Sequence, residues 1–210
     1  IAARAGAGEG DLLLIVADAK NSVVLSTLGA LRGEVAKKMN LIPEGRYNFL
    51  WITEFPFFEW DEDLQTYVAM HHPFTSPMDE DIPLLDTDKG SVRAKAYDLV
   101  LNGFEMSSGS IRITDPVLQK KMFSALGLSD EEAQQKFGFL TDAFKYGAPP
   151  HGGSGIGLDR LVMIMLGGSS IRDVVAFPKV QNMSELMTQC PSPVEAAQLD
   201  ELHIALKHEE

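Results

Sequence analysis

Two carboxylates, Asp98 and Glu105, stand on either side of an Asn-Gly dipeptide at positions 102 and 103. Asn-Gly between two runs of alternating apolar residues predicts a hairpin with a two-residue turn, because both turn positions need a positive φ. Pairing outward from this turn sets Val100 opposite Glu105, and alternation of side chains along a strand puts Asp98 on the same face. Two nearby carboxylates repel each other unless a cation or a shared proton lies between them. The pattern indicates a paired-carboxylate binding site, and the alternative interpretation is a solvated acidic face.

Arg112 follows Glu105 by seven residues, a spacing that puts it on the opposite face of an unbroken strand. The small residues at 107–110 tolerate a bulge, and one extra residue there turns Arg112 onto the carboxylate face. Gly109 is the predicted bulge site, because glycine adopts a positive φ freely. A guanidinium on that face can bind a carboxylate through two parallel hydrogen bonds, whereas the alternative is a solvated strand charge.

A glycine-rich segment, residues 152–157, precedes an apolar helix that begins near Leu158. Its glycines allow close approach of the backbone to a ligand, and the free amides at the start of the helix favour an anion. The segment lacks the lysine of a Walker A loop and the spacing of a dinucleotide fingerprint. Arg160 is the one cation in the stretch 158–166, and a poorly solvated guanidinium needs an anionic partner. That partner is a ligand or, alternatively, Asp173. We expect Arg160 to approach the carboxylate face and the four charged side chains to converge on one cleft.

His71 and His72 are adjacent in the sequence. Neighbouring strand residues point to opposite faces, so the pair is not expected to bind one metal ion together. One of the two can face a ligand, and the alternative is that both are satisfied by local hydrogen bonds.

The elements that must hold these residues fall into two groups. Residues 12–17 and 23–25 have the pattern of short strands, and a helix is predicted over 27–39. The turn-rich segment 42–46 then predicts a module boundary, after which most of the predicted site residues lie.

Beyond residue 46 the sequence predicts an α+β domain, with antiparallel strands in one block and helices around them. Residues 76–90, rich in proline and acidic residues, are predicted to form a mobile surface loop. The other predicted elements are strands over 48–54, 65–70 and 174–177, the hairpin, and helices over 116–126, 130–144 and 158–166.

Composition excludes several classes of protein. The net charge is −12, and the acidity lies beyond Arg46, where 25 Asp and Glu accompany 12 Lys and Arg. This argues against a bulk electrostatic nucleic-acid surface on this chain, although not against a nucleic acid held by another part of the protein. The single cysteine, Cys190, excludes an internal disulfide. There is no membrane-length apolar run and no signal segment. The composition predicts a cytoplasmic protein without a membrane partner, and the start at Ile1 predicts an incomplete translation product.

With these residues assembled, the chain resembles the bacterial-type aspartyl-tRNA synthetases, which are class II aminoacyl-tRNA synthetases. The resemblance runs from about residue 47 to 180, through FLWITEFPFFE, MHHPFTSP, AYDLVLNGFEMSSGSIRI and GIGLDRLVMIM. The last stretch resembles class II motif 3, and HHPFT with the NGFE-to-SIRI spacing narrows the likeness to the aspartyl enzymes. It implies that residues 46–210 are the C-terminal part of a class II catalytic core, an antiparallel sheet flanked by helices. Residues 1–45 would be the C-terminal part of the α+β insertion domain of the bacterial-type enzymes.

The resemblance also implies an ATP site. Its implied members are Glu105, Gly157, Leu158, Asp159 and Arg160. Within it, Arg160 matches the arginine that contacts the γ-phosphate of ATP, and Glu105 and Arg160 are the implied catalytic residues. Asp98 and Glu105 match the ligands of Mg²⁺.

For the amino acid, the resemblance implies that Arg112 binds the side-chain carboxylate of L-aspartate. His71 matches the histidine beside the bound amino acid, and His72 is the weaker candidate. The family usually has three glycines where this chain has Ser107, Ser108 and Gly109.

The implied activity is ATP-dependent activation of L-aspartate to aspartyl-adenylate and transfer to tRNA(Asp), in a full-length homodimer. Two alternatives stay open. One is a non-catalytic, synthetase-derived binding module, and the other is an amide-forming ligase of the asparagine synthetase type. The chain contains no stretch that resembles the family's anticodon-binding domain, motif 1 or motif 2.

We therefore expect the 210-residue chain alone to be inactive in aspartate activation, because half of the implied ATP site is missing. Aspartate-dependent exchange of pyrophosphate into ATP measures this step, with a full-length aspartate–tRNA ligase as the positive control. Robust exchange by the isolated chain would contradict the expectation.

Overall fold

The computed structural model describes residues 1–207 and divides the chain into two compact units, Ile1–Tyr47 and Asn48–Glu210. The division falls within two residues of the module boundary expected from the sequence. Among the described residues, no helix combines the length and apolarity needed to cross a bilayer.

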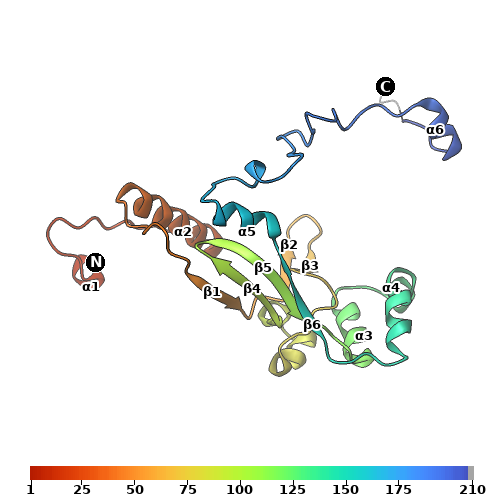
Figure 1. The fold of residues 1–210 in the computed structure, drawn as a ribbon. Coiled ribbons are helices and arrows are strands. Elements are labelled where there is room, and N and C mark those ends of the chain that lie inside the picture. Colours follow the sequence, from red (N-terminus) through yellow and green to blue (C-terminus); the bar gives the residue numbers. More distant parts are fainter. Residues whose placement is uncertain (208–210) are drawn as a thin grey trace. The chain divides into compact units, whose positions relative to one another are not determined.

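The first unit contains two helices, α1 (Ala2–Ala5) and α2 (Asn21–Lys38) (Figure 1). The strand predictions here are wrong, because residues 23–25 lie within α2 and residues 12–17 have no regular structure. The apolar run 12–17 has no neighbouring strand in this unit, and a strand without a partner leaves its backbone groups unpaired. None of residues 1–47 is buried, so this unit has no core of its own.

The second unit is built on a four-stranded antiparallel sheet with strand order β1-β4-β5-β6 (Figure 1). A two-stranded hairpin forms a separate small sheet. The main strands are β1 (Phe49–Thr53), β4 (Ala96–Leu101), β5 (Phe104–Ile111) and β6 (Gly152–Ile156), and the small hairpin is β2 (Phe58–Asp61) with β3 (Thr66–Ala69). The predicted α+β architecture is confirmed.

The turn between β4 and β5 is the predicted two-residue hairpin. Asn102 and Gly103 have φ values of 51° and 86°. The Asn102 side chain also accepts a hydrogen bond of 2.9 Å from the backbone of Asn48, next to β1. The turn residue thereby links the hairpin to the neighbouring strand.

A bulge interrupts this hairpin at Met106. Val100 lies opposite Glu105 and Leu99 lies opposite Ser107, so one residue of β5 has no counterpart on β4. Met106 and Ser107 are each 4% exposed, so two successive side chains are buried at the bulge. The bulge was predicted at Gly109 and lies instead at Met106, where burial of a large apolar side chain stabilises it.

Gly109 has a different role, which is to let β6 approach β5. A Cβ atom at position 109 would overlap the carbonyl oxygen of Gly153, and one at Gly152 would lie 2.9 Å from the carbonyl oxygen of Ser110. Strand β6 has the sequence GGSGI, and glycine has low strand propensity. Pairing with the small-residue strand β5 overrides that propensity.

The helices of the second unit largely follow the predictions. The Asp115 side chain caps the start of the helix at 116–125, and a capping box of Ser129 and Glu132 starts the helix at 130–144. The helices are α3 (Pro116–Ala125), α4 (Asp130–Phe144), α5 (Leu158–Met165) and α6 (Ala196–Glu201). The strand predicted over 174–177 is not formed; it follows a short 3₁₀ turn, Ile171–Asp173, and has no pairing partner.

The segment predicted as a mobile loop is part of the core. Residues Asp79–Asp86 form a 3₁₀ helix, and Leu85 is 1% exposed within the main apolar cluster. Arg93 holds this helix through ion pairs of 2.8 Å to Asp81 and 2.9 Å to Glu80. Hydrogen bonds from Arg93 lower the pKa of Asp81, which keeps this carboxylate ionised. The charged composition of the segment therefore marks an ion-paired cap on the core.

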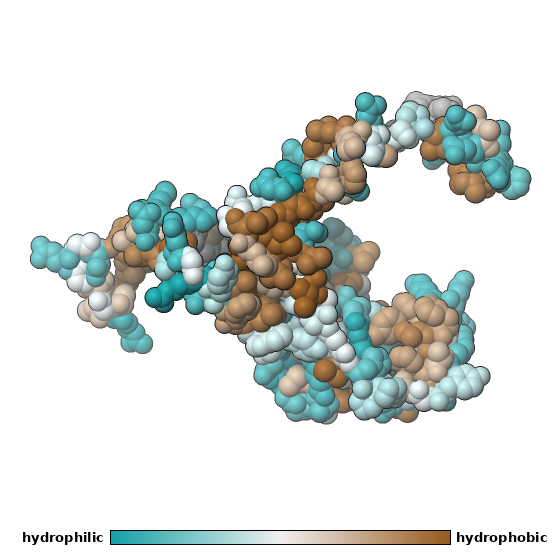
Figure 2. All heavy atoms as spheres, viewed as in Figure 1, coloured by the Kyte–Doolittle hydropathy of each residue, from teal (hydrophilic) through white to brown (hydrophobic). Residues whose placement is uncertain are grey.

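Apolar side chains remain exposed around the sheet. The exposed fractions are 61% for Phe49, 59% for Trp51, 68% for Leu158 and 69% for Met165. Figure 2 shows hydrophobic residues gathered around α5 and the neighbouring strands.

We expect Leu85→Ala to lower the free energy of unfolding of the second unit by about 3 kcal/mol, the usual cost of emptying a buried leucine site. Urea denaturation followed by tryptophan fluorescence measures this, because Trp51 and Trp60 are the two tryptophans and both lie in this unit. Leu64→Ala is the matched control, since Leu64 is 66% exposed. Equal effects of the two variants would show that the 3₁₀ helix does not belong to the core.

Candidate functional site

The bulge determines which side chains share a face of the sheet. Asp98 pairs with Ser108, and because alternate residues face the same side, Ser110 and Arg112 lie on the face of Asp98. Glu105, opposite Val100, lies on this face as well. The sequence-predicted common face is therefore confirmed, although the bulge that creates it lies elsewhere.

The four residue steps from Ser108 to Arg112, which directly follows β5, span about 13 Å along the strand direction. Asp98 and Glu105 thus lie toward the turn, and Arg112 lies toward the other end of β5. The site is elongated and its charges are spread along the face, whereas the sequence predicted that the four charged side chains would converge on one cleft.

At the turn end, Arg160 contacts Glu105. One guanidinium nitrogen of Arg160 donates to the Glu105 carbonyl oxygen at 2.5 Å and lies 3.4 Å from its carboxylate oxygen Oε1. The Gly157 amide donates to the Met106 carbonyl at 2.9 Å, so the bulged residue anchors the start of α5. Arg160 therefore bonds to Glu105 rather than to Asp173, its predicted structural alternative. Both side chains remain about half exposed, at 45% and 51%.

The Asp98 carboxylate is half-buried on β4. Within residues 1–207 it makes no hydrogen bond and no ion pair. It is therefore free to bind a cation or a donor group. No cluster of three or more potential metal ligands exists among His, Cys, Asp and Glu in this described part.

At the other end, Arg112 contacts His72. A guanidinium nitrogen of Arg112 lies 3.0 Å from Nδ1 of the imidazole and also contacts Nε2. The pKa of His72 is lowered first by burial and then by the positive charge of Arg112 and by His71. The imidazole is therefore neutral near pH 7 and can accept a hydrogen bond.

His71, the stronger candidate from the sequence, lies on the other side of the segment. Its ring packs edge-on against Phe55, with ring centroids 5.3 Å apart. Because His71 and His72 are adjacent, they were expected to point to opposite sides. The sequence did not indicate which of them contacts Arg112, because residues 71 and 72 lie in a bend outside any strand.

Two buried hydroxyl groups near Arg112 were not singled out from the sequence. Thr75 forms an isolated bridge with Arg112 and donates to the Ser110 hydroxyl at 3.3 Å. Thr75 is fully buried and Ser110 is 4% exposed. No local sequence signal marks them, because their contact joins segments 35 residues apart.

A cavity of about 720 Å³ adjoins Arg160. Arg172 and Lys179 also line it, and no carboxylate does. Three cations around one cavity favour an anionic ligand. Asp98 and Arg112 do not line this cavity.

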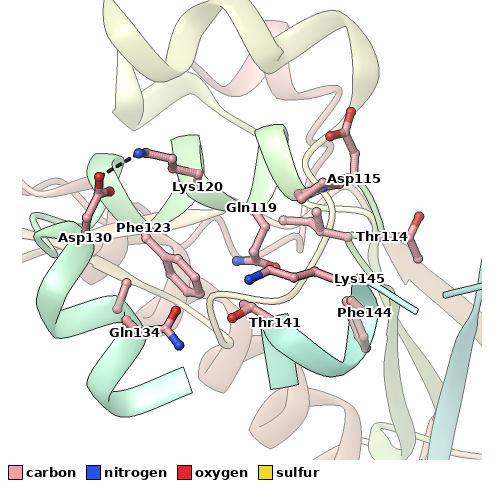
Figure 3. A pocket seen from close by; sticks show the side chains of 13 residues that line it. Thr114, Asp115, Gln119, Lys120, Phe123, Asp130, Gln134, Thr141, Phe144 and Lys145 are labelled. Carbon is pink, nitrogen blue, oxygen red and sulfur yellow. Dashed lines mark hydrogen bonds and ion pairs between the residues drawn. The ribbon is translucent and has the colours of Figure 1, made fainter. Parts of the chain in front are cut away.

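A second cavity, of about 360 Å³, lies between α3 and α4 (Figure 3). Its wall combines the rings of Phe123 and Phe144 with polar groups that include Gln119 and Thr141. It contains none of the sequence-predicted site residues.

Residues Gly157, Leu158 and Asp159 lie at the start of α5, beside Arg160.

A family model described as tRNA synthetases class II (D, K and N) matches residues 20–181. An aspartate–tRNA(Asp/Asn) ligase of Caldanaerobacter subterraneus subsp. tengcongensis is 62% identical over 94% of this chain and 33% of that protein. An aspartate–tRNA ligase of Ruminiclostridium cellulolyticum is 58% identical over 98% of this chain and 35% of that protein. In fold alone, the chain is similar to an aspartyl tRNA synthetase from Entamoeba histolytica, with a TM-score of 0.50 at 24% identity over 86% of this chain and 30% of that one. The chain spans about a third of the length of the curated relatives it matches.

The contact between Arg112 and His72 can be tested by NMR titration of the histidine rings. We expect the pKa of His72 to lie below its ordinary value of 6.5 and to rise in Arg112→Met, because a neighbouring positive charge is removed. Arg160→Met, at the other end of the face, is the control and should leave it unchanged. A His72 pKa that is insensitive to Arg112 would rule out the contact.

Proposed function

Because the chain belongs to the class II tRNA synthetases (D, K and N), we propose that it forms the C-terminal part of the catalytic site of an aspartate–tRNA ligase. The observation that carries this proposal is the single sheet face shared by two carboxylates and Arg112, with Arg160 joined to it through Glu105. Such a face offers a carboxylate-binding end and a phosphate-binding end. Residues 1–45 then belong to the inserted domain of the bacterial-type enzymes, and residues 46–210 to the catalytic core.

The proposed reaction begins with aspartate and ATP. An oxygen of the α-carboxylate of aspartate attacks the α-phosphorus in line; the new P–O bond gives aspartyl-adenylate, and the bond to pyrophosphate breaks. The protein supplies position and charge rather than a covalent nucleophile. The aspartyl group then passes to tRNA(Asp), and the whole enzyme is proposed to be a cytoplasmic homodimer.

The turn end of the face is proposed to bind ATP. Arg160 would hold the γ-phosphate, and the cationic cavity that it shares with Arg172 and Lys179 supports this assignment. Gly157, Leu158 and Asp159 would surround the adenosine.

The carboxylates of Asp98 and Glu105 fit Mg²⁺, which binds through one or two carboxylates and fills its other positions with water and substrate phosphates. The unpartnered Asp98 side chain and the half-exposed Glu105 side chain leave their oxygens accessible to it. Bound there, the ion would neutralise phosphate charge.

The other end is proposed to bind aspartate. Arg112 would bind its side-chain carboxylate and reject asparagine, because the amide presents a donor where the guanidinium needs an acceptor. His72, in contact with Arg112, is the better placed of the two histidines to lie beside the amino acid. His71 would then act indirectly, through its packing against Phe55.

A chimera tests the function directly. This chain replaces the matching third of the Caldanaerobacter ligase, to which it is 62% identical, and aspartate-dependent pyrophosphate exchange is measured. We expect exchange that depends on aspartate and is not supported by asparagine. A folded chimera without exchange would overturn the proposal.

Within the chimera, Arg112→Lys should lower kcat/KM for aspartate by about tenfold to a hundredfold while changing KM for ATP little, because an ammonium group cannot make the paired contact. Arg32→Lys, at an exposed position of α2, is the matched control. Unchanged kcat/KM for aspartate in Arg112→Lys would show that Arg112 does not read the substrate carboxylate.

A further inference from the structure

We propose that Gln119 is a positioning residue for the aspartate end of the site: its side-chain amide fixes the segment 71–75 so that His72 lies against Arg112. This inference rests on the proposed function for its link to aspartate. The contact itself can be tested without that function.

The geometry closes a short ring around Arg112. Gln119 Nε2 donates to the carbonyl oxygen of Pro73 at 2.9 Å, and Pro73 directly follows His72. Helix α3, which carries Gln119, begins at Pro116, only four residues after Arg112. The chain from 112 to 119, the Gln119–Pro73 hydrogen bond and the His72–Arg112 contact therefore form one loop.

Local hydrogen bonds hold part of this segment: the Thr75 amide donates to the His72 carbonyl at 3.3 Å, and the Phe74 amide donates to Nδ1 of the His72 ring at 3.2 Å. The Ile113 amide donates to the Phe74 carbonyl at 2.9 Å, so the ladder beside Arg112 reaches residue 74. Pro73 has no N–H group and cannot extend that ladder. Gln119 binds the carbonyl of Pro73, between His72 and the ladder, and thereby ties this local turn to helix α3.

The unused oxygen of Gln119 supports a role for the amide. Gln119 is 5% exposed, and its Oε1 is the buried side-chain polar atom without a hydrogen-bond partner in residues 1–207. An unsatisfied buried acceptor is destabilising, so the amide at this position is used for what its NH₂ group donates rather than for its oxygen. The NH₂ donor is the feature of glutamine that this position uses.

A neutral donor also suits the charge of the site. Figure 3 shows Gln119 among the side chains that line the cavity between α3 and α4, where the nearby ammonium groups of Lys120 and Lys145 are paired with Asp130 and Asp142. The amide fixes the loop without adding charge.

The test compares Gln119→Met, which keeps length but removes the donor, with Gln119→Glu, which keeps shape but accepts hydrogen bonds when ionised. Gln134→Met is the matched control, because Gln134 lines the same cavity from α4 and is exposed. The first readout is the NMR pKa of His72 in this chain. Release of the loop exposes His72 and separates it from Arg112, so the pKa should rise in both Gln119 variants and stay unchanged in the control.

The second readout uses the chimera with the Caldanaerobacter ligase. Gln119→Met should raise KM for aspartate by about tenfold while kcat and KM for ATP stay nearly constant, a split that a purely structural role would not produce. A raised His72 pKa without a change in KM for aspartate overturns the proposal, and so does an unchanged His72 pKa. Unfolding of both Gln119 variants with a folded control assigns Gln119 to helix packing and likewise overturns it. A chimera with no exchange removes the proposed function but leaves the His72 result as a test of the contact.

Discussion

The site depends on one extra residue in a strand. Without the bulge at Met106, Arg112 would face away from Asp98 and Glu105, and the two ends of the site would lie on opposite sides of the sheet. The same bulge leaves the Met106 carbonyl available to the Gly157 amide, which sets the start of α5 and therefore the position of Arg160. A single backbone irregularity thus puts Arg112 on the face of the two carboxylates and helps to place Arg160 beside Glu105.

Local signals explain what the sequence predicted well. The hairpin follows from the φ values that Asn102 and Gly103 adopt, and the helices α3 and α4 begin at the capping residues Asp115 and Ser129. Parity along β4 and β5 then required an irregularity if Arg112 was to join the carboxylates. The existence of the bulge was predictable from the number of residues between Glu105 and Arg112. The resemblance to class II motifs supplied the chemistry expected at each position.

Contacts between distant segments explain what the sequence could not give. The bulge lies at Met106 because that side chain is buried, and Gly109 is required by the carbonyl of Gly153 on another strand. Strand β6 forms against glycine's propensity for the same reason. The choice of His72 over His71 depends on a bend, and the burial of Leu85 depends on ion pairs made by Arg93. Each outcome is set by a neighbour remote in sequence.

Arg160 and Arg112 contact side chains of different charge, and this difference argues for two kinds of ligand. Arg160 is paired with the charged Glu105, so the charge of this guanidinium is compensated, whereas Asp98 on the same face has no partner within residues 1–207. Arg112 contacts His72, and the lowered pKa of His72 keeps the imidazole neutral. The positive charge of Arg112 therefore stays uncompensated. An uncompensated guanidinium attracts a carboxylate by itself. Under the proposed function, Arg112 can therefore attract the aspartate carboxylate by itself, whereas at the other end a metal ion held by Asp98 and Glu105 would free Arg160 to bind a phosphate.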